Sequence, residues 1–439
     1  MMIIIENLRK RKMKKGVIVI LIALLSVSII GCTTVPRRIS LPEKEREHIE
    51  SVAVVSAQYG PECVLNVYAK GAGSGAAKGA ARGVGAGLEA IADGGELLFL
   101  APVLLPVFLI GGATIGGMAG ASAAIPAEQA KGIECMIHSA VDECTIPRSL
   151  SAHAVETGSA STACRFRNFE NIGPISPDQS PDYSSIAHGE ADTVLEIRTP
   201  SAGVTSFGKG KDKPHFFYVE AETRLIRTAD GAELTSRSFI YFSEPLHIEE
   251  LCNDGTVIIR ECIDDSYQVL SENIIDTLFL TTSYSGNYIR KDGGLQPLYP
   301  KQQKAPFSDK LAFVKVDSLQ PELSWEAFPR PADKKLDTAK ESISSIKNVT
   351  YDLRIWMVKD EYPGEKVYER KGLPLPSHRL ETPLSPDTAY FWTVRARYTL
   401  TGQARVTRWS FYNKPAVYGA CTFIPLIPEP LYFRFKTPA

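Results

Sequence analysis

The sequence predicts a multidomain protein in which an α+β domain carries an inserted glycine-rich helical hairpin and is followed by an all-β sandwich. Three observations lead to this prediction. Short β-branched runs and one amphipathic helix occupy the middle of the chain. Glycines repeat at every fourth residue on either side of residue 100, and all four tryptophans lie after residue 315.

The N-terminal residues have the charge and hydropathy pattern of an export signal. Six cations precede an uncharged run from Gly16 to Gly31, and this order is typical of a secretory signal. The run is too short for a comfortable membrane span, which takes about 20 apolar residues. A signal that starts at Met13 is as complete as one that starts at Met1.

The end of this run resembles the bacterial lipobox. Residues 29–32 read Ile-Ile-Gly-Cys, and the resemblance implies cleavage before Cys32, attachment of diacylglycerol and N-acylation, with palmitate among the acyl chains. Three chains would anchor the protein stably in the bilayer. Thr33 follows where inner-membrane retention favours aspartate, so we expect the outer membrane rather than the inner one. The alternative is an uncleaved N-terminal anchor with Cys32 as a free thiol.

Composition limits the remaining chain. Without residues 1–31, 43 basic residues stand against 49 acidic ones, a net charge near −6. This mildly acidic chain has no basic excess to bind nucleic acid. About 400 residues predict two or three domains. We expect these parts: a signal at 1–31, a tether at 32–50, an α+β domain at 51–285 with a hairpin inserted at 70–128, a linker at 286–314 and a β-sandwich at 315–439.

The cysteines other than Cys32 read as structural. Cys252 and Cys262 enclose a short segment that can turn back on itself, and we expect them to form a disulfide bond in the oxidising envelope. Cys135 and Cys144 are the next closest pair. Because no cysteine has the CxxC spacing of zinc or redox sites, we expect no metal site and no cofactor.

Eight glycines form two stripes at period four. A stripe without side chains lets another backbone approach closely, as in GxxxG helix pairs. We therefore expect a helix near 71–91, a turn at 93–96 and a second helix after Pro106, packed as a hairpin. The glycines that would pack the two helices are Gly71, Gly75, Gly79, Gly83, Gly87, Gly112, Gly116 and Gly120.

This segment resembles the glycine zippers of bacterial envelope proteins, and three fates stay open. It could enter the bilayer as a second anchor or a homo-oligomeric element, pack on the α+β domain, or form a low-complexity loop. Lys78 and Arg82 argue against deep burial of the first helix. Residues 97–127 carry no charge and are long enough to cross a membrane, although Pro102 and Pro106 would kink a helix there.

The α+β domain is predicted from alternating apolar residues. A hairpin is expected at Asp230-Gly231, and an amphipathic helix near 264–281. The pattern looks like a loosely defined group of periplasmic domains in outer-membrane lipoproteins, and it transfers no site. The expected strands are 51–56, 63–68, 193–198, 217–226 and 239–242.

No catalytic motif appears in the sequence. The histidines at 138, 153, 188, 215 and 247 lack HExxH spacing, and no nucleophile elbow occurs. The adjacent carboxylates Glu249 and Glu250, like Asp264 and Asp265, do not share a face and read as solvated charges. We therefore expect a protein that is not an enzyme.

The C-terminal region is predicted to be all-β, after a linker rich in proline and glycine at 293–306. In the strand at 389–398, alternation places Arg395 and Arg397 on one face. The core face should carry Tyr390, Trp392, Val394 and Ala396. The other expected strands are 322–328, 349–356 and 366–370.

Residues 384–390 (Leu-Ser-Pro-Asp-Thr-Ala-Tyr) resemble the fibronectin type III signature at the corner between strands E and F. The resemblance implies that the Tyr390 hydroxyl ties the turn to upstream backbone. It also implies that Trp325 is a core residue of strand B and that Trp409 starts the last strand. Four prolines interrupt that strand before 431–437, which could complete the sheet. No Arg-Gly-Asp occurs, so integrin binding is not implied.

Taken together, these patterns predict a noncatalytic lipid-anchored envelope protein that binds or assembles at the periplasmic face of the outer membrane. Its fibronectin-like module would dock a protein or a glycan. The alternative is a hydrolase or transporter-accessory lipoprotein whose site is dispersed over loops of the α+β domain. A pocket with convergent carboxylates in that domain would favour the alternative.

Overall fold

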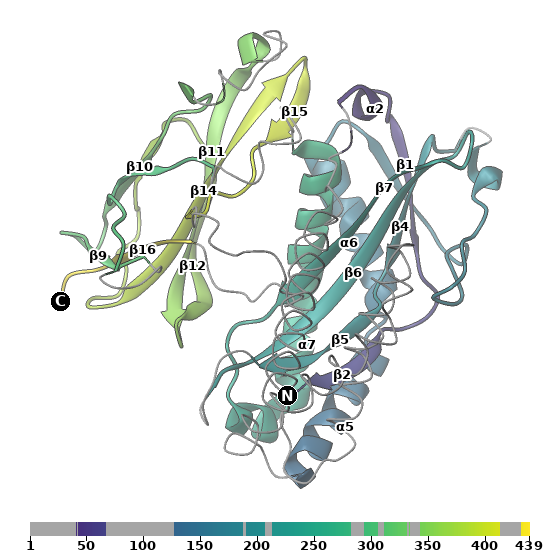
Figure 1. Ribbon diagram of the computed structural model, residues 1–439, viewed down its shortest axis with the longest axis horizontal. Coiled ribbons are helices and arrows are strands. Elements are labelled where there is room, and N and C mark those ends of the chain that lie inside the picture. Colours follow the sequence, from purple (N-terminus) through teal and green to yellow (C-terminus); the bar gives the residue numbers. More distant parts are fainter. Residues whose placement is uncertain are drawn as a thin grey trace, which may run out of the picture.

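The computed structural model describes residues 41, 43–66, 127–187, 190–206, 213–281, 294–305, 311–331, 333, 343–412 and 432–439. These residues form a mixed α/β domain and a β domain that lie side by side (Figure 1). The multidomain α+β and β architecture expected from the sequence is therefore present. The predictions for Cys32 and for the two glycine stripes concern residues outside the described ranges.

The first domain is built on one seven-stranded sheet. Strand β1 pairs with β4, and β2 pairs with β5, both in parallel. Strands β4 and β5 both pair antiparallel with the long strand β6. Beyond these, β3 pairs with β1 and β7 pairs with β6. The strands are β1 (Ser51–Ser56), β2 (Glu62–Asn66), β3 (Arg165–Phe169), β4 (Thr193–Arg198), β5 (Ser201–Ser206), β6 (His215–Arg227) and β7 (Glu233–Phe242).

The five strands expected in this domain are present, with shifted ends for all but β1 and β4. The β6–β7 hairpin turns at the expected Asp-Gly, where Gly231 adopts a φ of 68°. Strands β3 and β5 were not predicted. In β5, Gly203 is required because a Cβ built there would lie 1.8 Å from the carbonyl oxygen of Val64. The small and polar residues that permit this approach also hide the strand from a hydrophobicity pattern.

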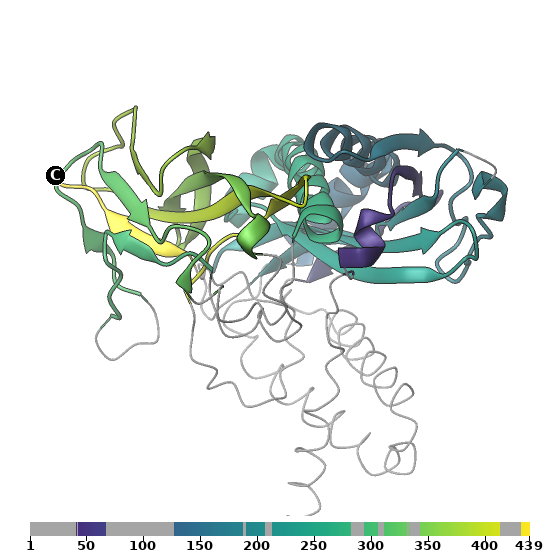
Figure 2. The same cartoon turned by 90° about the horizontal axis from the view of Figure 1, so that it is seen from above.

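Three helices cover one face of the sheet: α5 (Ala127–Glu143), α6 (Ile146–Ser161) and α7 (Ile248–Ile275). Figure 2 shows them on the same side of the strands. Their apolar residues pack with those of β1, β4, β5 and β6 into one core. The amphipathic helix expected at 264–281 is the second half of α7 and the π-helical turn Asp276–Leu280 that follows it.

The disulfide expected between Cys252 and Cys262 is wrong. Both residues lie on α7, and the helical rise separates them by about 15 Å, whereas bridged Cα atoms lie within about 7 Å. The segment between them continues the helix instead of turning back. Cys252 is exposed, Cys262 is buried, and all six cysteines that the structure describes, Cys135 and Cys144 included, are free.

The second domain consists of a three-stranded and a six-stranded sheet. The smaller sheet has the order β13-β10-β8, and the larger has β12-β11-β14-β16-β9, with β15 also on β14. The strands are β8 (Pro297–Tyr299), β9 (Val314–Lys315), β10 (Glu322–Trp325), β11 (Lys347–Lys359), β12 (Tyr362–Leu373), β13 (Ser377–Arg379), β14 (Ala389–Leu400), β15 (Gln403–Val406) and β16 (Phe433–Lys436).

Side chains from both sheets form its core, with Trp325 and Trp392 fully buried. Alternation along β14 is confirmed: all four residues expected on the core face lie in this core. The hydroxyl of Tyr390 accepts a hydrogen bond from the backbone N–H of Ser385 at 3.0 Å, which is the expected tie. The pairing of β16 with β14 agrees with the expectation that 431–437 completes the sheet.

Two expectations about this region need correction. The stretch at 293–306 is not simply a linker, because β8 pairs with β10 and Leu295 is buried in the core of the second domain. Trp409 does not start a strand, although the neighbouring Ser410 donates a backbone hydrogen bond to Val394.

In the described part of the chain, no helix combines the length and the apolarity that crossing a bilayer requires.

Candidate functional site

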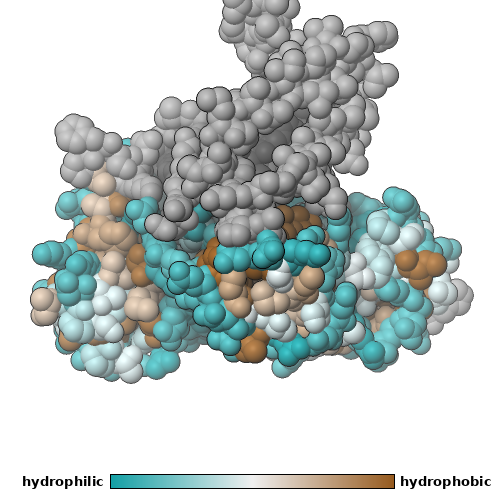
Figure 3. All heavy atoms as spheres, turned by 90° about the horizontal axis from the view of Figure 1, so that it is seen from below, coloured by the Kyte–Doolittle hydropathy of each residue, from teal (hydrophilic) through white to brown (hydrophobic). Residues whose placement is uncertain are grey.

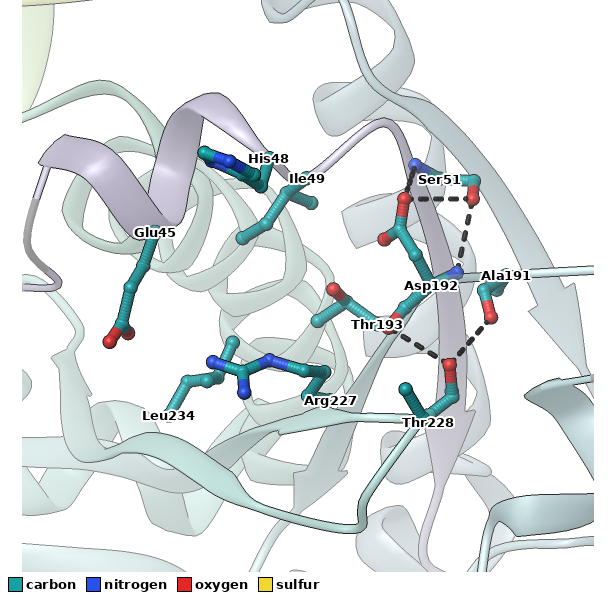
Figure 4. Close-up of a pocket in the computed structure, with 11 residues that line it drawn as sticks. Glu45, His48, Ile49, Ser51, Ala191, Asp192, Thr193, Arg227, Thr228 and Leu234 are labelled. Atoms are coloured by element: carbon teal, nitrogen blue, oxygen red, sulfur yellow. Dashed lines mark hydrogen bonds between the residues drawn. The ribbon is translucent and has the colours of Figure 1, made fainter.

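A pocket of about 640 Å³ lies beneath α2 (Glu43–Glu47), at the end of the sheet where β1 and β4 begin and β6 ends (Figure 4). Its volume falls within the usual range of small-ligand sites. Charged side chains from three separate segments line it: Glu45, Asp192 and Arg227. Ile49 and Leu234 supply apolar wall.

Helix α2 is held in place by two buried residues, one before the helix and one within it. Leu41 is 4% exposed and lies in the main core of the domain. Arg46 is also buried, and its guanidinium donates to the carbonyl oxygen of Thr281, just after α7. Because Leu41 and Arg46 hold this segment against the domain, Glu45 and His48 lie at the pocket and line it.

The carboxylate of Asp192 joins the starts of β1 and β4. Its Oδ2 accepts hydrogen bonds from the backbone N–H groups of Glu50 and Ser51, at 2.9 and 3.0 Å, and from Ser51 Oγ at 3.2 Å. Its Oδ1 is buried and has no hydrogen-bond partner among the described residues. Figure 4 shows this oxygen turned toward the side of the pocket where Ile49 lies.

The opposite wall comes from the end of β6. Thr228 Oγ1 donates to the carbonyl oxygens of Ala191 and Asp192, each at 2.9 Å, which fixes the loop before β4. The Arg227 guanidinium extends along the pocket in Figure 4 and donates from Nη1 to Asp230 at 3.1 Å. The pocket therefore presents negative charge from α2 and β4 and positive charge from β6.

The described lining of the pocket is not arranged as a hydrolytic triad. Asp192 contacts Ser51 directly, whereas a hydrolytic triad places a histidine between the acid and the nucleophile. Within the described ranges, no three His, Cys, Asp or Glu side chains are placed to hold a metal ion. What the pocket offers is a shaped cavity, charges of both signs and a buried acceptor.

A second cluster of charges lies where α7 meets the β domain. Arg395 on β14 is 1% exposed. Its guanidinium pairs with Asp352 at 2.8 Å, with Glu272 at 3.1 Å and with Asp276. Asp352 is on β11, whereas Glu272 is in the last turn of α7 and Asp276 begins the π-helical turn that follows it. One arginine thus bridges two domains.

Arg354 on β11 makes a parallel bridge. It pairs with Glu272 on α7 and with Glu369 on β12, the latter at 2.8 Å. The guanidinium groups of Arg354 and Arg395 both lie over the ring of Trp409, each 4.4 Å from its centroid. Such cation–π contacts strengthen when water is excluded. We use the name interface cluster for the following residues: Glu272, Asp276, Asp352, Arg354, Glu369, Arg395, Arg397 and Trp409.

The charges of the interface cluster shift one another's pKa values. Burial raises the pKa of Asp276, and the nearby Arg395 only partly opposes it. Burial also tends to raise the pKa values of Glu272 and Glu369, but the positive charges of their arginine partners outweigh this effect. The pKa of Glu272 is lowered, and that of Glu369 falls to about 2.

Contacts between the domains extend along the length of α7. At its start, His247 Nε2 lies 3.0 Å from Asp360. Beyond its end, Thr281 forms a parallel bridge with Val406. The interface cluster, at the end of α7, lies between these two contacts.

The predicted lipid site Cys32 and the eight glycines lie outside the described residues, and neither the pocket nor the interface cluster contains a site residue predicted from the sequence. Asp192 was missed because a single aspartate before a strand carries no motif. Arg395 was placed on the correct face of its strand, but its acidic partners are distant in sequence. The one available signal was the spacing of Glu272 and Asp276, which puts both on one face of a helix.

No protein-family model matches the chain, and no curated protein is similar to it. Among solved structures, the PelC dodecamer from Paraburkholderia phytofirmans is 13% identical, with 55% of this chain and 94% of that chain covered and a TM-score of 0.21. Protein XCC0632 from Xanthomonas campestris is 11% identical, with 29% and 56% covered and a TM-score of 0.19.

Lipoprotein GNA1162 from Neisseria meningitidis is 16% identical, with 26% of this chain and 83% of that chain covered and a TM-score of 0.16. TM-scores at this level are too low to assign a fold or a function.

Proposed function

We propose that this protein is a noncatalytic lipoprotein of the bacterial envelope, anchored through acylated Cys32, that binds or assembles a partner at the periplasmic face of the outer membrane. The interface cluster supports this proposal because it joins the two domains through buried ion pairs. A pair of domains joined in this way presents its surfaces in one fixed arrangement.

The position of Leu41 is the observation that carries the proposal. This residue is 4% exposed and packs in the core of the first domain. The nine peptide units from Cys32 to Leu41 reach at most about 32 Å when fully extended. An acylated Cys32 would thus keep the α2 end of the protein, and the pocket beneath it, close to the membrane surface.

The β domain is the proposed docking module, with a fibronectin type III-like arrangement. In support, β8, β10 and β13 form one sheet while β12, β11 and β14 neighbour one another in the other, and Tyr390 ties its corner to Ser385. A protein or a glycan is the proposed partner. Trp325 and Trp392 offer no platform for it because they are buried, and the Trp409 ring already contacts two arginines. Trp356 is half-buried, and its ring stacks on Tyr432 with 4.9 Å between the centroids.

The glycine-rich segment is the proposed second membrane or oligomerisation element. It would leave the first domain after β2 and return at the start of α5. Both of these points lie at the end of the sheet opposite α2 (Figure 1).

Extraction of membranes with carbonate and with detergent tests the proposal. The full-length protein would be compared with Cys32→Ala and with a deletion of residues 71–127. Incorporation of an alkyne-tagged fatty acid would report acylation directly. We expect labelling that depends on Cys32 and release of Cys32→Ala by carbonate. Unlabelled wild type would contradict a lipid anchor, and Cys32→Ala that stays bound until residues 71–127 are removed would show a second membrane element.

A hydrolase remains the second candidate because Glu45 and Asp192 line the same pocket. The two carboxylates would act as acid and base on a bound substrate. Glu45→Gln and Asp192→Asn would each then abolish turnover of a panel of ester, amide and glycoside substrates. If wild type turns over none of these substrates faster than the double variant, this candidate fails.

A further inference from the structure

The carboxylate of Asp192 is only half used by the fold. Three donors surround Oδ2, while Oδ1 is buried and meets no donor from the described residues. Leaving a buried acceptor without a donor costs about 1–3 kcal/mol, and more if the group is charged. A ligand that brings an N–H or O–H group to Oδ1 would recover this cost. Because Oδ1 is shielded from solvent in this structure, a neighbouring side chain has to move aside when the ligand binds, as interface side chains commonly do.

The charges around the pocket limit what such a ligand can be. Glu45 and Asp192 are negative, and Arg227 on the facing wall is positive. A ligand with a cationic donor at one end and an anionic group a few atoms away matches this pattern. Arg227 is partly exposed, with 43% of its side-chain surface accessible, and Nη1 is the atom that binds Asp230. The rest of its guanidinium fork faces a ligand.

We propose that this pocket binds a zwitterionic phosphoethanolamine group, with the primary ammonium on Asp192 Oδ1 and Glu45 and the phosphate on Arg227. The group could come from the headgroup of phosphatidylethanolamine or from a soluble molecule that carries it. The membrane source rests on the proposed function, because a lipid-anchored Cys32 keeps α2 within about 32 Å of the bilayer.

The pocket distinguishes a primary ammonium from a quaternary one. Asp192 Oδ1 needs a hydrogen-bond donor, and a trimethylammonium group has none. Sites for quaternary ammonium groups are typically cages of aromatic rings. The described lining of this pocket contains no Phe, Tyr or Trp, and its apolar wall comes from Ile49 and Leu234. Phosphocholine is therefore the matched control ligand.

The most exposed large apolar side chains do not belong to the pocket lining. Figure 3 shows hydrophobic groups on one face as separate areas among hydrophilic ones. The most exposed of the large hydrophobic side chains, Ile175 and Leu375, do not line the pocket. Binding through charge and hydrogen bonds at α2 is thus separable from any apolar contact elsewhere.

Calorimetric titration of the purified full-length Cys32→Ala protein with phosphoethanolamine and with phosphocholine tests the proposal. We expect saturable binding of phosphoethanolamine and at least about tenfold weaker binding of phosphocholine, the loss of one charge-assisted hydrogen bond. Asp192→Asn and Arg227→Gln should each weaken phosphoethanolamine binding about tenfold or more. Arg148→Gln, in an exposed pair with Glu170 on another element, is the matched control.

Circular dichroism would confirm that each variant is folded before its affinity is compared. Equal affinity for both ligands, no binding, or unchanged affinity in folded Asp192→Asn would overturn the proposal. Vesicles of phosphatidylcholine with and without phosphatidylethanolamine then separate the sources: binding that depends on phosphatidylethanolamine identifies the lipid. Binding of the free compound alone supports the site with a soluble source. Neither assay needs the lipid anchor, so a failure here is distinct from a failure of acylation.

Discussion

The interface cluster and the α2 pocket use the same kinds of side chain in opposite ways. At the interface, Asp352 receives Arg395, Arg397 and the backbone N–H of Gly372. In the pocket, Asp192 has one oxygen with three donors and one with none that the structure describes. The first carboxylate is satisfied by the protein itself, and the second is not.

This difference separates structure from binding. A fully paired network of buried charges fixes one arrangement of the elements that supply it, and breaking it is costly. A half-paired carboxylate in a cavity retains the capacity to recognise a ligand. The number of partners at each oxygen is therefore more informative than the presence of charged residues.

Removal of the arginine that bridges the domains should have the largest effect. Arg395→Leu leaves Asp276 and Asp352 buried without their main partner, so we expect a loss of about 3–5 kcal/mol in the free energy of unfolding. Urea denaturation followed by tryptophan fluorescence measures it. Arg370→Leu breaks an ion pair with Glu381 at the surface of the same domain and is the control. An equal loss in the free energy of unfolding for both variants would show that the buried ion pairs of Arg395 contribute no more than the exposed pair of Arg370.

Truncation of the pocket carboxylate should cost less. Asp192→Ala removes three hydrogen bonds at the junction of β1 and β4, and we expect a loss of about 1–2 kcal/mol. Asp192→Asn keeps an acceptor for the same donors and should be less destabilising. An equal loss in the free energy of unfolding for Asp192→Ala and Arg395→Leu would contradict the distinction between the pocket carboxylate and the interface cluster.

Acid should weaken the protein in two separate pH windows. Burial, together with Lys213 and His247, lowers the pKa of His215 from 6.5 to about 4. The unfolded chain binds this proton first, so stability falls as the pH drops from about 6.5 to about 4. Glu369 has a pKa lowered from 4.5 to about 2, and its contribution is lost as the pH drops through that lower range.

Urea denaturation at a series of pH values tests both assignments. His215→Asn should flatten the upper window only, and Glu369→Gln the lower window only. An unchanged profile in either variant would contradict the corresponding assignment. Asp276 acts in the opposite sense: its pKa is raised above 3.8, so its protonation favours the folded state as the pH falls toward 3.8 and offsets part of the loss above that pH.

The smallest effect is expected from reduction. Since Cys252 and Cys262 are free, a reducing agent should leave the urea midpoint unchanged. Alkylation should modify exposed Cys252 in the folded protein. Cys262 should react only after unfolding, because burial raises its pKa to about 12 and blocks access. A peptide that links the two residues in a digest would refute this.

Local patterns predicted the elements better than they predicted the contacts between them. The strand at 389–398 could be assigned because its alternation is a property of adjacent residues. The longer α7 could not, since its first half carries Gly255 and a residue with non-helical φ and ψ, Asp254, and is held by tertiary packing. Its second half has a clear apolar face.

The candidate site was beyond local patterns altogether. Asp192 acquires its role only when β1 and β4 become neighbours, although many residues separate them in the chain. The pairing of Arg395 with Glu272 likewise depends on how two domains pack. Neither contact has a sequence period, and the spacing of Glu272 and Asp276 shows only that they share a helix face, not which residue they meet.

The two exits from the first domain bear on how the protein would lie against a membrane. Leu41 enters beside the start of β1, whereas the chain leaves after Asn66 at the far end of the sheet. The 13-residue strand β6 runs between these ends and spans about 40 Å. If the lipid at Cys32 and the segment after Asn66 both contacted one bilayer, the strands of this sheet would run roughly parallel to the membrane plane. With the lipid as the sole attachment, the strands could run perpendicular to that plane.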